Sequence, residues 1–288
     1  MFKSSSSFVL SLQRTIPAFF PAKSTQGLWE PTSCQPRLKG RMAETTVCKQ
    51  SNAGLECEKA ITRKRKVIEH LVVFQMKEGL TEDQEKDMLD HLYTLQYQLR
   101  GILTVSLGSN IANENMNGCT HGLFMRFPSK EALGGYYESP ARWRVEHDYI
   151  FPYYNGMICI DYEAEVEDDI EPIFRRGEVF EEGVESLMLL QVKPDVDPSK
   201  VKEGLNSVSH LVDELGTLVV QHTSGLNIGE LGKGYTHGMV TRFLSEEARD
   251  IFMQHPHYVE IVETKLKPNF LKMLTVEFNV APVGTTAL

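Results

Sequence analysis

The chain carries one sequence pattern twice, 116 residues apart, and this repeat limits its possible folds more than any other feature. Residues 118–133 and 234–249 match at nine of sixteen positions, and residues 69–76 align with residues 185–192. Two copies of one domain of about 100 residues follow, which is an ordinary domain size. At 288 residues, with 41% hydrophobic and 24% charged residues, the chain is long enough for two small globular domains.

The two copies show the same order of expected elements. The strands expected from alternation are 68–76, 104–111, 120–127 and 157–162 in copy one, and 184–192, 217–224, 236–243 and 271–280 in copy two. Helices are expected after the capping residues Thr81, Ser129, Asp197 and Ser245. This β-α-β-β-α-β order predicts an α+β fold of two tandem ferredoxin-like domains, each with helices on one face of an antiparallel sheet. Packing the two bare faces together would close an intramolecular α/β barrel.

A segment rich in acidic residues separates the two copies. Residues 161–182 contain ten Asp or Glu residues, and we expect residues 164–182 to form a solvated linker. The acids lack the alternating spacing of oxygen ligands in a calcium loop, so a cation site is not favoured. The two domains are then expected at 67–163 and 183–282, preceded by a short linker at 44–66.

Residues 1–43 have the composition of an organellar transit peptide. Up to residue 41 they hold six basic residues against one acid, Glu30, and they are rich in serine. We therefore expect a chloroplast address, with the mitochondrion or an ordinary disordered tail as alternatives. Met42 offers a second start that would leave an untargeted, cytosolic form. The final Leu288 is the one residue shared with a Ser-Lys-Leu peroxisomal address.

Composition argues against several classes of partner. The formal net charge of -9 gives no general attraction to nucleic-acid phosphates. No apolar run approaches the roughly 18 residues that cross a bilayer. Five cysteines without a Cys-x-x-Cys pair do not make a zinc ligand set. We therefore expect neither nucleic-acid binding nor membrane insertion.

Histidines occupy one strand position in both copies. His121 and His237 begin alternating runs, and the alternation places His121 on the same face as His70, so that these two could sit together in copy one. A general base needs a partner that holds its tautomer, and no acid recurs beside these histidines in both copies. A histidine hydrogen-bonded within the fold is therefore the favoured interpretation. The residues expected to line a ligand pocket are His70, Val72, Phe74, His121, Leu123, His237 and Met239.

A second pair of histidines lies in the second helical region of copy two, where Pro256 separates His255 from His257. Proline breaks the helix, so the pair lacks the i, i+4 spacing that places two metal ligands on one helix face. Copy one has Ser139 and Ala141 at the matching places. Serine nucleophile elbows, phosphate-binding glycine loops and dinucleotide fingerprints are also missing. We expect no metal and no cofactor.

Three short motifs resemble the plant stress-response A/B barrel (Dabb) family of the dimeric α+β barrel superfamily. They are residues 69–74 (EHLVVF), 235–238 (YTHG) and 255–259 (HPHYV), in the expected order. The resemblance covers residues 67 to about 282, in two copies. It implies a tandem, organelle-targeted member, associated with stress response or antifungal defence, whose domains pair through their sheets. Haem handling or oxygenation, known elsewhere in the superfamily, is a distant alternative.

One member of that family, olivetolic acid cyclase, is an enzyme that folds a linear polyketide. The resemblance places its catalytic tyrosine and histidine at Tyr136 and Arg142 in copy one, and at Phe252 and Tyr258 in copy two. Neither copy keeps the pair, because phenylalanine cannot hold a proton and arginine cannot act as a base at neutral pH. The weak catalytic candidates that remain are His121, His237, Tyr136 and His257.

The sequence thus favours a non-enzymatic, stress-associated α/β barrel. We expect it to bind a small apolar ligand or a protein partner, and self-association through the outer faces stays open. A cofactor-free, polyketide-cyclase-like enzyme working in a pocket between sheet and helices is the alternative.

Overall fold

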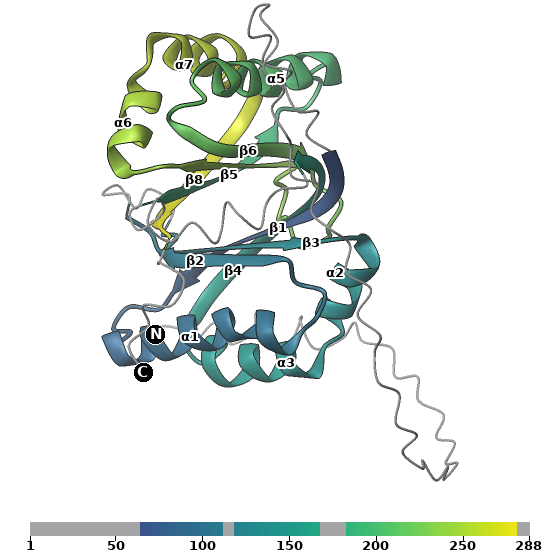
Figure 1. The fold of residues 1–288 in the computed structure, drawn as a ribbon, viewed down its shortest axis with the longest axis vertical. Helices are drawn as coiled ribbons and strands as arrows, with labels where there is room; N and C mark the ends of the chain where they lie inside the picture. The colour runs from purple at the N-terminus through teal and green to yellow at the C-terminus, as the bar shows by residue number, and fades with distance from the viewer. Residues whose placement is uncertain (1–63, 112–117, 168–182, 281–288) are drawn as a thin grey trace, which may run out of the picture. The chain divides into compact units, whose positions relative to one another are not determined.

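Alternating apolar residues build two four-stranded antiparallel sheets, one in each repeat, in the computed structural model of the protein (Figure 1). The structure describes residues 64–111, 118–167 and 183–280. The first sheet has the order β2-β3-β1-β4 and the second the order β6-β7-β5-β8. The strands are β1 Lys64–Met76, β2 Thr104–Ser109, β3 His121–Phe127, β4 Tyr154–Glu167, β5 Val184–Val192, β6 Val219–Leu226, β7 His237–Phe243 and β8 Phe270–Asn279.

Helices cover one face of each sheet. They are α1 Glu82–Gln98, α2 Lys130–Tyr137 and α3 Pro140–Val145 in repeat one, and α5 Pro198–Glu214, α6 Glu246–Gln254 and α7 Pro256–Ile261 in repeat two. The expected caps are confirmed: Thr81 forms a capping box with Gln84, and Asp197 caps α5 ahead of Pro198. The sequence did not predict the π-helical turns η1 Glu146–Ile150 and η2 Val262–Leu266, which follow α3 and α7.

The bare faces of the two sheets pack against each other. The core between them draws from both repeats: Val67, Leu71, Val73, Phe124, Ile160, Tyr162, Ala164 and Val166 from the first, and Leu187, Leu189, Val240, Leu274, Val276 and Phe278 from the second. Strand β4 contacts β6, and β8 contacts β2. In Figure 1 the two sheets lie between the helices of the two repeats. The predicted fold of two ferredoxin-like repeats packed sheet to sheet is therefore confirmed.

The threonine of the repeated Thr-His-Gly motif closes the end of the central strand. Thr120 Oγ1 accepts a hydrogen bond from the backbone N–H of Met76 at 3.0 Å. Thr236 Oγ1 accepts one from the N–H of Val192 at 3.1 Å. In both repeats a bulge shifts the register with the edge strand at this point, and the hydroxyl satisfies a backbone donor there.

The glycine of the motif makes room for an aromatic ring from the opposite repeat. A Cβ atom on Gly122 would lie 2.6 Å from the ring of Phe278, and one on Gly238 would lie 2.8 Å from the ring of Tyr162. Both distances are well inside van der Waals contact, so a larger residue would have to displace the ring. Tyr162 on β4 and Phe278 on β8 hold equivalent places, so each repeat inserts one ring into the other.

The acid-rich segment begins as strand and not as linker. We expected a solvated linker from residue 164, but β4 continues to Glu167. Tyr162 and Ala164 point into the core between the sheets, whereas Glu163 faces solvent and pairs with Lys66 at 2.9 Å. Alternation explains the difference, because the acids occupy the outward positions of a strand whose inward positions are apolar.

Several expectations fall wholly or mainly outside the described residues. These are the transit peptide at 1–43, the linker at 44–66 except its last three residues in β1, the linker from residue 168 to 182, and the C-terminal signal at 281–288. Within the described ranges, no helix is long and apolar enough to cross a membrane.

Candidate ligand site in the first repeat

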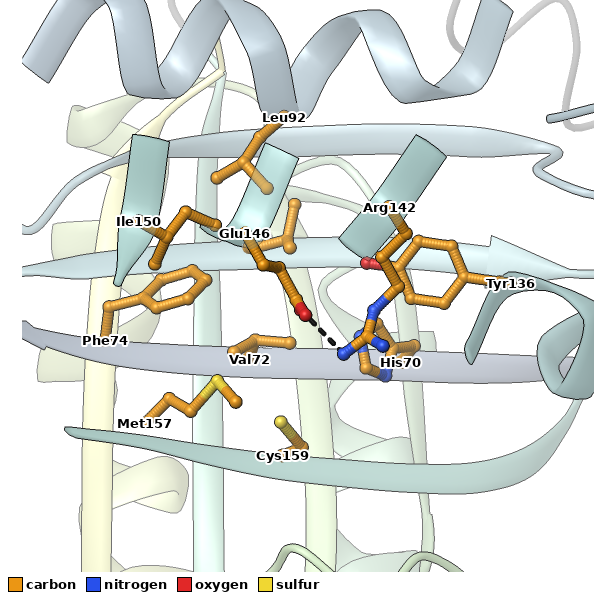
Figure 2. A pocket seen from close by; sticks show the side chains of 11 residues that line it. His70, Val72, Phe74, Leu92, Tyr136, Arg142, Glu146, Ile150, Met157 and Cys159 are labelled. Carbon is orange, nitrogen blue, oxygen red and sulfur yellow. Dashed lines mark ion pairs between the residues drawn. The ribbon is translucent and has the colours of Figure 1, made fainter. Parts of the chain in front are cut away.

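A small cavity lies between the sheet and the helices of repeat one (Figure 2). Its lining residues are His70, Val72, Phe74, Leu92, Leu123, Tyr136, Arg142, Glu146, Ile150, Met157 and Cys159. Its free volume of ≈ 10 Å³ is about that needed for one water molecule. Most of the wall is apolar, and the ionisable side chains gather at one end, around His70 and Arg142 (Figure 2).

His70 belongs to a buried acid–base cluster beside the cavity. Its Nδ1 lies 2.6 Å from Asp161 Oδ1, and the Tyr137 hydroxyl donates to Asp161 Oδ2 at 2.8 Å. His70 and Asp161 are cross-strand neighbours on β1 and β4, only 2% and 3% exposed. An acceptor at Nδ1 favours the tautomer with its proton there, which leaves Nε2 as the basic nitrogen. Burial, and next the charge of Asp161, raise the pKa of Tyr137, so Tyr137 remains a donor.

Arg142 and Glu146 form an ion pair of 2.6 Å at the polar end of the cavity (Figure 2). Burial raises the pKa of Glu146, although Arg142 opposes this effect. Burial alone would lower the pKa of Arg142, but Glu146 and the tyrosines together raise it above its ordinary value. Burial also raises the pKa of Tyr136, whose ring centre lies 5.1 Å from the Arg142 guanidinium. At neutral pH the polar end therefore presents the Arg142 cation, paired with Glu146, and a neutral phenol.

Repeat two builds the same elements without this cluster. The equivalents of His70, Tyr136, Tyr137, Arg142 and Glu146 are Ser186, Phe252, Met253, Tyr258 and Val262. Phe252 and Tyr258 pack together in the helix-facing core of repeat two, with ring centroids 5.1 Å apart. The acid at the place of Asp161 is Glu277, which pairs with Arg249 at 2.8 Å. The polar cluster is therefore not a requirement of the fold.

The structure separates His121 from His70, contrary to our expectation that the two could sit together. His70 lies opposite Met125 in the β1–β3 ladder, whereas His121 lies opposite Phe74. The two histidines are four strand positions apart, or about 13 Å. His121 Nε2 lies 2.8 Å from Glu85 of α1 instead, and burial lowers the pKa of His121. His121 thus fastens α1 to β3 and is not among the residues that line the cavity.

The sequence candidates in repeat two do not meet at one site. His237 Nδ1 lies 3.0 Å from Thr236 Oγ1 and its ring contacts Phe270, while Met239 is buried in the core under α5. His255 is the N-cap of α7, because its side chain accepts a hydrogen bond from the backbone N–H of His257. The side chain of His257 is exposed. Among the described residues, no group of three His, Cys, Asp or Glu side chains could hold a metal ion.

Sequence reasoning missed Asp161, Tyr137 and Glu146. Asp161 belonged to the strand expected at 157–162, but it also begins the acidic run and was not considered as a site residue. The available signal was its place: a closing strand antiparallel to the first brings Asp161 opposite His70. The sequence holds no such signal for Tyr137 and Glu146, because their distance from His70 and Arg142 depends on how α2 and η1 cross the sheet.

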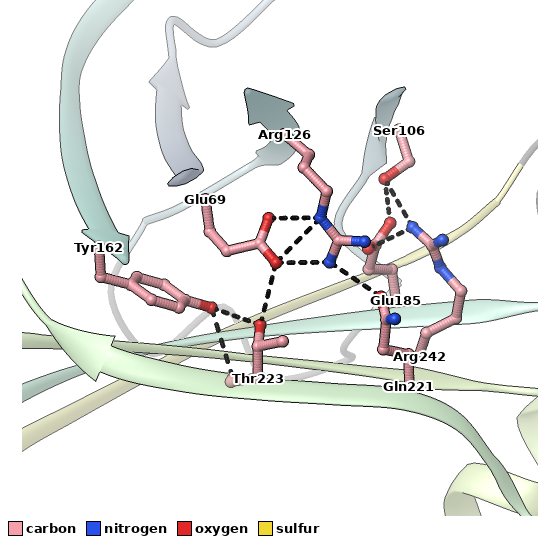
Figure 3. A network of polar contacts seen from close by, with 8 residues as sticks. All are labelled: Glu69, Ser106, Arg126, Tyr162, Glu185, Gln221, Thr223 and Arg242. Carbon is pink, nitrogen blue, oxygen red and sulfur yellow. Dashed lines mark hydrogen bonds and ion pairs between the residues drawn. The ribbon is translucent and has the colours of Figure 1, made fainter. Parts of the chain in front are cut away.

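A second cluster of buried charges lies between the two sheets and holds the repeats together (Figure 3). Arg126 Nε donates to Glu69 Oε2 at 2.9 Å in repeat one, and Arg242 Nη2 donates to Glu185 Oε1 at 2.5 Å in repeat two. Both carboxylates are at most 1% exposed. The two pairs occupy equivalent positions in the repeat, so the cluster has no net charge when all four groups are ionised.

Each buried carboxylate also receives a hydroxyl from the opposite repeat (Figure 3). Thr223 donates to Glu69 Oε1 at 3.3 Å, and Ser106 donates to Glu185. Burial raises the pKa of Glu69, and Arg126 opposes this rise. None of these residues lines the cavity. We therefore assign the network a structural role, which is to fix the register of one sheet on the other.

Comparisons with known proteins agree with this architecture. The family model described as the Stress responsive A/B Barrel Domain (Dabb) matches residues 68–164 and 184–280. A stress-response A/B barrel domain-containing protein of Arabidopsis thaliana is 24% identical over 219 residues, which are 75% of this chain and 80% of that protein. The crystal structure of an anthrone oxidase-like protein aligns with 75% of this chain and 91% of its own, at 10% identity and a TM-score of 0.54. That likeness concerns the fold.

Proposed function

The chain belongs to the stress responsive A/B barrel domain family, and we propose that it is a non-enzymatic, stress-associated protein whose first repeat binds a small, mainly apolar ligand. The ligand would lie between sheet and helices, with its apolar part against residues such as Val72 and Phe74. A single polar atom, a carbonyl or hydroxyl oxygen, would meet Tyr136 and Arg142 at the other end. A protein partner remains the second possible type of bound molecule.

The observation that carries the proposal is the difference between the repeats. Repeat two forms the same sheet and helices with Phe252 and Val262 where repeat one has Tyr136 and Glu146. Burying charged and polar groups costs free energy, and even a buried ion pair stabilises a fold little more than apolar side chains in the same place would. Since the fold does not need the polar cluster, the gain is most simply ligand recognition.

The ionisation of the site supports binding over catalysis. Arg142 stands where the cyclase-like pattern has a histidine, and its raised pKa keeps it a cation at neutral pH. Tyr136, with a raised pKa, remains a hydrogen-bond donor. Both groups suit an oxygen acceptor on a bound molecule, and neither suits the removal of a proton.

The volume of the cavity sets a condition on binding. A space for one water molecule does not hold a ligand of several carbon atoms. Binding therefore requires side chains to move, and the unbranched Met157 is the most adaptable apolar side chain in the lining. A ligand that fills the cavity should accordingly stabilise the folded chain against heat.

Native mass spectrometry of the full chain, purified from its native tissue, tests this proposal. The expected result is a small molecule that is released when the chain is denatured. Long incubation of the intact complex before denaturation should leave that molecule unchanged. The matched variant Tyr136→Phe/Arg142→Tyr gives repeat one the residues of repeat two and should lose the molecule. Phe252→Tyr, the reverse change in repeat two, should keep it. Recovery of the chain with no adduct, or equal loading of the double variant, would contradict the proposal.

A second candidate function is proton transfer at the same site. The 2.6 Å contact between His70 and Asp161 holds a histidine tautomer in the way that a general base requires. A cofactor-free, cyclase-like enzyme would use this pair. Such an enzyme would convert the bound molecule while the complex is incubated. His70→Gln would stop this conversion without preventing the molecule from binding.

We also propose a plastid address for residues 1–43 and leave self-association through the outer faces as a separate proposal. The basic, serine-rich and acid-poor composition supports the first. Residues 1–66 fused to a fluorescent protein should enter plastids, whereas the same fusion started at Met42 should stay in the cytosol. Light scattering of the purified chain would measure self-association directly.

A further inference from the structure

We propose that the loop between β6 and β7 of the second repeat forms part of the ligand site of the first repeat, by fixing the position of Asp161. Residues 227–234 of this loop are called the strap below. The inference rests on the proposed function, because Asp161 holds His70 in the site assigned there. It gives repeat two, which lacks the polar cluster, a direct role in that site.

The strap pairs with the edge of β4 along the part of that strand that borders the site. The backbone N–H of Ile228 donates to the carbonyl of Asp161 at 2.7 Å. The backbone N–H of Cys159, which lines the cavity, donates to the carbonyl of Leu231 at 3.1 Å. The strap thus takes the place of a fifth strand next to the site.

One side chain of the strap ties its turn to the same strand. Asn227 Oδ1 accepts the backbone N–H of Asp161 at 3.1 Å and that of Gly229 at 2.9 Å. Its Nδ2 donates to the carbonyl of Gly229 at 3.1 Å. The backbone of Asp161 is therefore held on both its N–H and its C=O by consecutive strap residues.

The strap also approaches the carboxylate itself. A Cβ atom on Gly229 would lie 2.5 Å from Asp161 Oδ2. This is the oxygen that accepts the Tyr137 hydroxyl at 2.8 Å, while the other oxygen meets His70. A side chain at position 229 would displace either the carboxylate or the strap that holds it. Glycine is therefore the residue that lets the strap lie against the site without disturbing it.

The opposite edge of the barrel repeats the backbone contacts of the strap, beside Glu277. Ile111 N–H donates to the carbonyl of Glu277 at 2.8 Å, and Asn110 Oδ1 accepts the Glu277 N–H at 3.1 Å. The sequence continues from this Asn-Ile pair to Ala112 in repeat one and to Gly229 in repeat two.

The test is Gly229→Ala in the full chain, read by the imidazole ¹⁵N resonances of His70 in histidine-labelled protein at pH 7.5. His70→Gln identifies the resonances, and Asp161→Asn gives the shift that follows loss of the carboxylate. We expect Gly229→Ala to move the His70 resonances in the same direction as Asp161→Asn. Gly134→Ala is the matched control: it lies on α2 with no atom within 4 Å of its added Cβ, and should leave the resonances in place.

A folded Gly229→Ala protein with wild-type His70 resonances would overturn the inference. If Gly229→Ala does not fold, Asn227→Ala takes its place, since it removes the acceptor for the Asp161 N–H without adding bulk. Movement of the His70 resonances in Asn227→Ala supports the inference, and unchanged resonances overturn it.

The measurement needs no ligand, so the two proposals can fail separately. Shifted His70 resonances together with a chain that carries no small molecule would keep the positioning role of the strap and remove the binding function. Unchanged resonances in a chain that does carry a small molecule would keep the binding function and remove the positioning role of the strap.

Discussion

At the residue scale, the repeated Thr-His-Gly motif divides three tasks among three neighbouring side chains. The threonine satisfies a backbone donor at a bulge, and the histidine bonds to that threonine, with Nδ1 at 2.8 Å from Oγ1 in repeat one and 3.0 Å in repeat two. The glycine accommodates a ring from the other repeat. All three tasks are structural. A motif of this kind therefore repeats because the fold repeats, while the polar cluster around His70 occurs once.

Gly238→Ala should destabilise the protein by about 1–3 kcal/mol, because the new methyl group would overlap the Tyr162 ring in a packed core. The free energy of unfolding in urea measures this. Gly134→Ala has open space around it on a helix and should be neutral or stabilising by up to about 1 kcal/mol. Equal effects of the two substitutions would contradict the assigned role of Gly238.

His222 should make the protein less stable in mild acid. Its Nδ1 lies 2.8 Å from Thr241 Oγ1, and burial lowers the pKa of His222 to about 4. An unfolded histidine has its pKa near 6.5, so below that pH the unfolded chain binds the proton more readily than the folded chain. The stability from neutral His222 is thus complete above about pH 6.5 and declines as pH falls towards 4.

Urea denaturation at pH 7 and pH 5 measures this effect, which we expect to be about 1–2 kcal/mol for His222. His222→Gln should reduce the difference between the two pH values by that amount. His121 and His237, whose pKa values burial also lowers, should contribute in the same direction. A pH dependence identical in wild type and His222→Gln would refute the assignment.

At the scale of single elements, the His-Pro-His stretch is the start of a helix. His255 caps α7 and Pro256 takes its first position, as Ser139 and Pro140 do for α3. The two caps are equivalent in the repeat, and only the capping group differs. The histidine thus performs a task that a serine performs elsewhere in the same chain.

His255→Ala should cost about 1 kcal/mol, and His255→Ser should cost less than that or nothing, since serine is among the best N-cap residues. Thermal unfolding followed by circular dichroism measures both. His257→Ala, at an exposed residue beside the cap, is the control and should leave the melting temperature unchanged. A loss in His255→Ser as large as that in His255→Ala would argue for a role beyond capping.

The elements were more predictable from the sequence than the site. Capping residues and alternation gave the strand and helix order, because these are local signals repeated in two copies. The site depends on which residues lie opposite each other across strands, and a shift of four positions separated His121 from His70. The same cross-strand pairing places Asp161 opposite His70, which its position at the start of an acidic run did not indicate. Tyr137 and Glu146 required the three-dimensional path of the helices.

At the scale of the whole molecule, the two repeats share one buried polar network and one apolar core. The network links Glu69 and Arg126 of repeat one to Thr223 of repeat two (Figure 3). A buried ion pair of this kind adds little net stability over an apolar replacement, but breaking it leaves a charge without a partner. Its benefit is that the sheets meet in one register.

Glu69→Leu should destabilise the chain by about 3–5 kcal/mol, because Arg126 would remain buried without its carboxylate. The double variant Glu69→Leu/Arg126→Leu should lose less than the single one, and a double-mutant cycle of unfolding free energies measures the coupling. Lys66→Ala, which breaks the exposed pair with Glu163, should cost less than about 1 kcal/mol. A double variant as unstable as the sum of the two single ones would show that the pair is not coupled.

The exchange of rings between the repeats has a consequence for descent. In a two-fold dimer of identical chains, one gene would encode both the ring and the glycine that receives it, and a single mutation would alter both contacts at once. In this chain the ring of Tyr162 meets glycines of repeat two, and the ring of Phe278 meets glycines of repeat one. The two contacts can therefore change independently, as the hydroxyl that Tyr162 directs to Thr223 illustrates. The two halves of this chain thus need not be identical, yet each ring still depends on the glycines of the other repeat.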